Sequence, residues 1–123
     1  MATQKDFEAI FQRLRSILQH YAPRMTVIDD QSGNYCLDTP YSEQYKKTVF
    51  FGAAKIKKNY VSFHLMPVYM ATNLLEGMSP ELRKRMQGKS CFNFTKLDDG
   101  LIDELTTLTQ KGFDRWVEQK LVT

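Results

Sequence analysis

The segment TVFFGAAKIKKNYVSFHLM, residues 48–66, decides the fold of this chain. Residues 48–56 and 60–66 are rich in β-branched and aromatic side chains, and the polar residues 57–59 separate them. This pattern predicts a β-hairpin. The next residue, Pro67, ends the second strand, because proline has no N–H to donate to the ladder.

Two further strand regions lie on either side of this hairpin. Upstream, the short β-branched run 25–29 is followed by a turn signal at Gly33 and Asn34 and by the strand-like residues 35–37, which predicts another hairpin. Downstream, residues 90–96 alternate around Phe92 and Phe94, the pattern of a half-buried strand. The sequence therefore predicts about five strands.

Amphipathic helices are predicted at both ends of the chain. Thr3 and Asp6 resemble a capping box for the first helix, residues 5–22, and Pro23 ends it. The last helix begins at about Asp99, and Gly112 on its apolar face predicts a close backbone approach. The inward residues of the first helix are Phe7, Ile10, Phe11, Leu14, Ile17, Leu18 and Tyr21, and those of the last are Leu101, Ile102, Leu105, Leu108, Phe113, Trp116 and Val117.

Between these regions, residues 73–87 predict two short helical pieces that are broken at Gly77, with Ser79 as an N-cap. The order of elements is typical of one α+β domain that spans residues 1–123. We expect a mainly antiparallel sheet of about five strands, with the N- and C-terminal helices packed on one face. Trp116 should be buried against the first helix.

Composition narrows the classes of partner and the compartment. The 17 basic and 14 acidic residues give a net charge of +3, which is too small to favour nucleic acid or a membrane surface as a partner. We interpret the basic residues as a solvated hairpin tip and helix face, with phosphate binding as the alternative: Lys46, Lys47, Lys55, Lys57, Lys58, Arg83, Lys84 and Arg85. The first residues lack the apolar run of a signal peptide, so we expect a cytoplasmic protein. Cys36 and Cys91 lack metal or redox spacing and are expected to be buried thiols.

Residues 48–105 contain five short motifs in a fixed order. They are FGAAKI at 51–56, NYVSFHLMP at 59–67, SPEL at 79–82, GKSCF at 88–92 and LDD at 97–99. In this order they resemble the bacterial YdhG-like family, a domain of unknown function. The resemblance implies a small α+β cytoplasmic domain. Because some relatives are described as frataxin-like iron chaperones, it also implies iron binding by carboxylates as an alternative function.

Strand alternation predicts a candidate binding surface. If Val61, Phe63 and Leu65 face the helices, then Tyr60, Ser62, His64 and Met66 lie on the opposite, open face of the sheet, which Cys91, Asn93 and Thr95 share. We expect residues 67–70, including Tyr69, to close its edge. The candidate ligand-binding residues are therefore Tyr60, Ser62, His64, Tyr69 and Asn93. A dimer interface or an ordinary polar sheet face is the alternative to a pocket.

No catalytic or metal-binding motif stands out. His20 and His64 lack metal-ligand spacing to a partner, and no nucleophile with a base can be identified, so we predict no cofactor, no metal and no catalytic residue. The predicted function is non-catalytic binding of a small molecule or a partner protein, with a homodimer as one form of the latter. An iron-binding chaperone and an enzyme with an unrecognised site are the alternatives.

Overall fold

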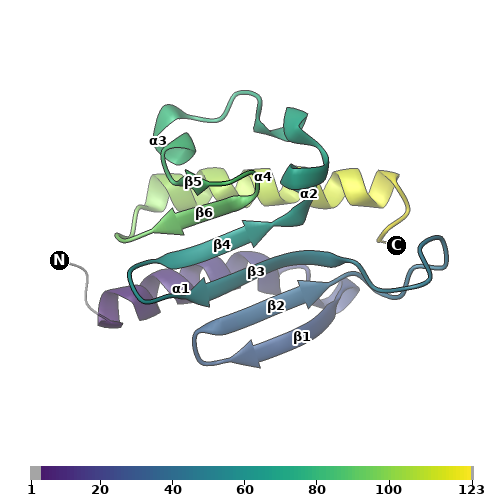
Figure 1. The fold of residues 1–123 in the computed structure, drawn as a ribbon, viewed down its shortest axis with the longest axis horizontal. Helices are drawn as coiled ribbons and strands as arrows, with labels where there is room; N and C mark the ends of the chain where they lie inside the picture. Colours follow the sequence, from purple (N-terminus) through teal and green to yellow (C-terminus); the bar gives the residue numbers. More distant parts are fainter. Residues whose placement is uncertain (1–3, 123) are drawn as a thin grey trace.

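The computed structural model describes residues 4–122 (Figure 1). The predicted capping box depends on Thr3, which lies outside the described residues. The elements follow in this order: α1 (Gln4–Gln19), η1 (Ala22–Arg24), β1 (Thr26–Gln31), β2 (Asn34–Asp38), β3 (Phe50–Ile56), β4 (Val61–Leu65), α2 (Met66–Met70), η2 (Thr72–Leu75), α3 (Pro80–Arg83), β5 (Met86–Gln87), β6 (Cys91–Phe94) and α4 (Asp99–Glu118).

The strands form one six-stranded sheet in the order β1-β2-β3-β4-β6-β5, and every neighbouring pair is antiparallel. Both predicted hairpins are confirmed, and Gly33 has a φ of +75° in the first turn, a conformation that favours glycine. The helical prediction is wrong for residues 86–87. They form β5, which is only two residues long and is specified by its pairing with β6 rather than by a pattern of its own.

The helices α1 and α4 pack on the same face of the sheet, as predicted, and together cover it (Figure 1). Trp116 is 1% exposed, and its ring packs edge-on against Phe51 of β3 with centroids 5.5 Å apart. All the predicted inward residues of both helices are buried except Val117, which is half-buried. Apolar burial is therefore concentrated between the helices and one face of the sheet.

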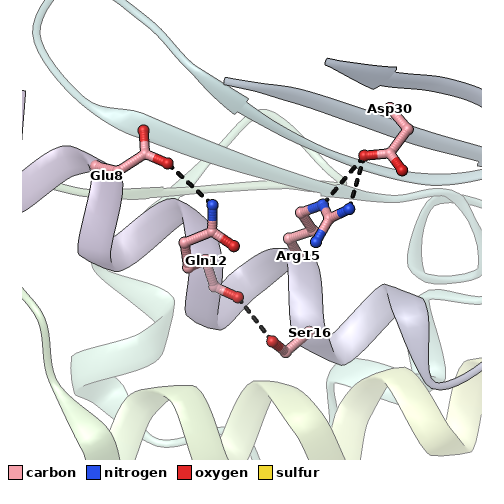
Figure 2. Close-up of polar contacts among 5 residues, drawn as sticks. All are labelled: Glu8, Gln12, Arg15, Ser16 and Asp30. Atoms are coloured by element: carbon pink, nitrogen blue, oxygen red, sulfur yellow. Dashed lines mark hydrogen bonds and ion pairs between the residues drawn. The ribbon is translucent and has the colours of Figure 1, made fainter. Parts of the chain in front are cut away.

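Polar contacts orient α1 relative to the edge hairpin (Figure 2). The Arg15 guanidinium donates to Asp30 of β1 at 2.7 Å and lies 5.0 Å from the centroid of the Tyr35 ring. Along the helix, Gln12 donates to Glu8 at 2.9 Å, and the Ser16 hydroxyl donates to the Gln12 carbonyl at 2.8 Å. Because Arg15 combines an ion pair with ring stacking, it joins α1 to both strands of the first hairpin.

After β4 the chain turns toward α4 and forms α2. Pro67 and Val68 are buried, and a Cβ on Gly112 would lie 2.9 Å from the Pro67 Cβ. The predicted close approach at Gly112 is therefore confirmed. Met66 packs against the core at this turn, so its predicted place on the open face is wrong. Among the described residues, no helix has the length and apolarity needed to cross a bilayer.

Candidate functional site

The face of the sheet opposite α1 and α4, which we call the open face, carries a pocket of about 270 Å³. We call this the sheet-face pocket. Its lining residues come from β3, β4, β5, β6 and the turn between β3 and β4: Phe50, Ala53, Lys55, Lys57, Tyr60, Ser62, His64, Gln87, Cys91 and Asn93. Four of the five predicted ligand-binding residues, Tyr60, Ser62, His64 and Asn93, thus lie together.

Strand register brings these side chains together. His64 pairs with Ala53 on one side and with Cys91 on the other, and Ser62 pairs in the same way with Lys55 and Asn93. These two rows run across the open face, because laterally paired residues point to the same side of a sheet. In β4 the burial alternates, with residues 61, 63 and 65 buried and residues 62 and 64 half-buried, as the sequence predicted.

An irregularity in β3 brings an aromatic side chain into the pocket. The register between β2 and β3 shifts between Leu37 and Asp38, so Leu37 pairs with Gly52 but Asp38 pairs with Phe50. As a result, Phe51 packs on Trp116 under the helices, whereas the Phe50 ring lies edge-on to His64 with centroids 4.9 Å apart. Strict alternation from Lys55 and Ala53 would have placed residue 51 in the pocket instead.

His64 is the most constrained polar residue of the pocket. Its Nε2 atom lies 2.8 Å from the Oγ atom of Ser90, and Ser90 is only 6% exposed. Burial, with a smaller contribution from the like charge of Lys55, holds the pKa of His64 below its ordinary value of 6.5. The lowered pKa favours the neutral imidazole at pH 7, and the bond to Ser90 holds the orientation of the ring.

A second hydrogen bond orders the far side of the pocket. The Asn93 side-chain nitrogen donates to the Gln87 side-chain oxygen at 2.7 Å. This bond joins β6 to the short edge strand β5 and leaves the amide nitrogen of Gln87 and the amide oxygen of Asn93 as groups that can meet a ligand.

Some predicted residues lie elsewhere. Tyr69 is 55% exposed on α2 and is not among the residues that line the pocket. The reason is the turn at Met66 and Pro67, which takes the chain from the sheet to α4 instead of continuing along the edge of the open face. Thr95 is exposed beyond the end of β6 and does not line the pocket.

The structure adds several residues that the sequence analysis did not select. Ala53 and Lys55 follow from alternation in β3 and could have been found from sequence. Phe50 could not, because its position depends on the register shift, and Gln87 could not, because β5 has no strand pattern. Lys55 and Lys57, which we interpret from sequence as part of a solvated hairpin tip, both line the pocket.

The two cysteines and the possible metal ligands were compared with the predictions from sequence. Cys36 and Cys91 are both free thiols and are half-buried rather than buried as we expected, and Cys91 lines the pocket on the open face as predicted. Burial raises the pKa of the Cys36 thiol. Within residues 4–122, no group of three or more His, Cys, Asp and Glu side chains lies close enough to hold a metal ion.

Comparisons of the chain with protein-family models, with curated proteins and with solved structures found no match.

Proposed function

We propose that this protein is a cytoplasmic, non-catalytic domain of the YdhG-like type that binds a small molecule in the sheet-face pocket. The observation that carries the proposal is the convergence of Tyr60, Ser62, His64 and Asn93 on one concavity. A few convergent polar groups beside apolar side chains are typical of small-ligand sites. A second copy of the chain or another protein on the same face is the alternative.

The character of the His64–Ser90 pair supports binding rather than catalysis. Ser90 is 6% exposed, so its hydroxyl is poorly placed to attack a substrate. The pair instead holds the His64 ring at a fixed angle to the pocket, and a preorganised side chain loses less conformational entropy when a ligand binds.

A screen with a pocket-filling variant tests the proposal. We would titrate the ¹⁵N-labelled protein with small neutral, anionic and cationic fragments and follow amide shifts of β3, β4 and β6. Ser62→Leu places a larger side chain in the pocket and should abolish the shifts. Thr95→Leu adds the same side chain outside the pocket and should leave them unchanged.

Two outcomes would contradict the proposal. One is that no fragment shifts these amides. The other is a concentration-dependent dimer in sedimentation experiments that Ser62→Leu disrupts and Thr95→Leu does not, which would make the open face a dimer interface. Titration of the wild-type protein with ferrous iron tests the chaperone alternative, because that function requires saturable metal binding.

A further inference from the structure

The sheet-face pocket is chemically divided along β3. Phe50 and Ala53 line it at the start of the strand, whereas Lys55 and Lys57 line it at the end of the strand and in the following turn. Ala53 and Lys55 are two residues apart in an extended strand that rises about 3.3 Å per residue, and the Phe50 ring lies beside His64, which pairs with Ala53. The apolar end and the Lys55 end are therefore about 7 Å apart, close to the length of a small molecule. The pocket therefore has an apolar end and a positively charged end.

The charged lining residues are all cations. Lys55 and Lys57 line the pocket, and no Asp or Glu side chain is among its lining residues. Hydrogen-bond donors accompany them: the Ser62 hydroxyl, the Tyr60 hydroxyl, and the amide nitrogen of Gln87, whose oxygen already accepts from Asn93. Cations and donors without a carboxylate match the charge and hydrogen-bonding needs of an anion.

We infer that the ligand is a small organic anion, with its carboxylate or phosphate at Lys55 and Lys57 and its apolar body against Phe50 and Ala53. This inference rests on the proposed function, because it uses the same pocket. The pocket volume of about 270 Å³ is just below the range of about 300–1,000 Å³ that is typical of pockets for drug-sized ligands. This size favours a small molecule with one apolar group.

Because His64 lies in the same pocket, anion binding should be coupled to protonation of its ring. The titratable groups that line the pocket with His64 are Lys55, Lys57, Tyr60 and Cys91, and Cys36 and Asp38 lie on β2 beside β3. Burial is the larger cause of the lowered pKa of His64, and the like charge of Lys55 is the smaller one. An anion at Lys55 offsets the smaller cause and attracts the imidazolium, so we expect the pKa of His64 to rise when the anion binds. By linkage, the anion then binds more tightly as the pH falls through the His64 pKa.

Four aromatic probes of similar size test the charge preference: benzoate, phenyl phosphate, neutral benzamide and cationic benzylamine. We would measure their dissociation constants from amide shifts at low ionic strength. We expect the tighter of the two anions to bind at least about tenfold more tightly than benzamide, as charge-assisted hydrogen bonds would predict. The ratio of benzoate to phenyl phosphate affinity distinguishes a carboxylate ligand from a phosphate ester, and added salt should weaken both.

Lysine variants locate the anion. Lys55→Gln, at a half-buried position, should weaken binding of the tighter anion about tenfold, and Lys57→Gln, at an exposed position, about two- to fivefold. Lys58→Gln is the matched control, because Lys58 is the exposed neighbour of Lys57 and does not line the pocket. It should leave the affinity unchanged. The His64 ring protons should report a higher pKa with the anion bound.

The outcomes separate this inference from the proposed function. If benzamide or benzylamine binds as tightly as the anions and Ser62→Leu abolishes that binding, the anion preference is wrong and the pocket remains a ligand site. If Lys58→Gln weakens the anions as much as Lys57→Gln does, the charge effect belongs to the hairpin tip and the inference is wrong. If none of the four probes shifts the pocket amides, the inference also fails, whereas the wider fragment screen decides the proposed function.

Discussion

The two faces of the same sheet differ in what surrounds their side chains. On the helix-covered face, Phe63 and Leu65 of β4 are fully buried against other apolar groups, and the nearby Trp116 is 1% exposed. On the open face, Ser62 and His64 of the same strand are half-buried around a concavity. One strand thus supplies the core and the candidate site from alternate residues. We expect mutations on the first face to change mainly stability and those on the second to change mainly binding.

The largest effect should come from the helix-covered face. Trp116→Ala removes a buried ring that packs on Phe51, so we expect unfolding free energy to fall by about 3–5 kcal/mol. Denaturant titration followed by circular dichroism measures this loss. Glu118→Ala, at an exposed position of the same helix, is the control and should stay within about 0.5 kcal/mol of the wild type. A loss below about 1 kcal/mol for Trp116→Ala would mean that α4 contributes little to the core.

An intermediate effect on stability is expected at His64, a residue of the open face that is hydrogen-bonded to the buried Ser90. His64→Ala leaves the hydroxyl of Ser90 without its partner, and Ser90 is only 6% exposed. We therefore expect the free energy of unfolding to fall by about 1–3 kcal/mol. The double variant with Ser90→Ala should lose less than the sum of the two single variants, because the unpaired hydroxyl is gone. If the losses of unfolding free energy in the two single variants are strictly additive in the double variant, as measured by chemical denaturation, the hydrogen bond does not contribute to stability.

The same residue should make stability depend on pH. Because the folded-state pKa of His64 lies below 6.5, the unfolded chain binds the proton more readily than the folded protein does. The contribution of His64 to stability is therefore unfavourable below its folded pKa and rises with pH until it levels off above about 6.5. His64→Gln should flatten this part of the profile in denaturant titrations between pH 5 and 7.5. An unchanged profile would contradict the cause assigned to the shift.

The smallest effect on stability should come from the rim of the pocket. Tyr60→Phe removes only a hydroxyl from a half-buried residue of the open face, so the unfolding free energy should change by less than about 0.5 kcal/mol. The affinity for any pocket ligand that accepts a hydrogen bond should nevertheless fall. Paired thermal melts and amide-shift titrations compare the two quantities. A large loss of stability with unchanged binding would reverse the comparison between the faces.

The candidate site could be predicted from sequence only where regular alternation holds. Ser62 and His64 follow from the burial of their neighbours in β4, and Asn93 follows from Phe92 and Phe94 in the same way. The prediction that Tyr69 closes the edge of the open face is wrong, because a proline that ends a strand does not reveal the direction of the chain beyond it. Here Pro67 lies in the first turn of α2, and its contact with Gly112 directs the segment to α4.

The sequence alone determined the hairpins, the two long amphipathic helices, the common face that they cover and the burial of Trp116. These features follow from local periodicity, and from the fact that each helix has a single apolar face that must be buried against the sheet. Only the tertiary structure decided the sixth strand, the shift that brings Phe50 to His64, and the bond between His64 and Ser90. Each depends on how strands align in space, and pairing register between distant segments leaves no periodic pattern in the residues themselves.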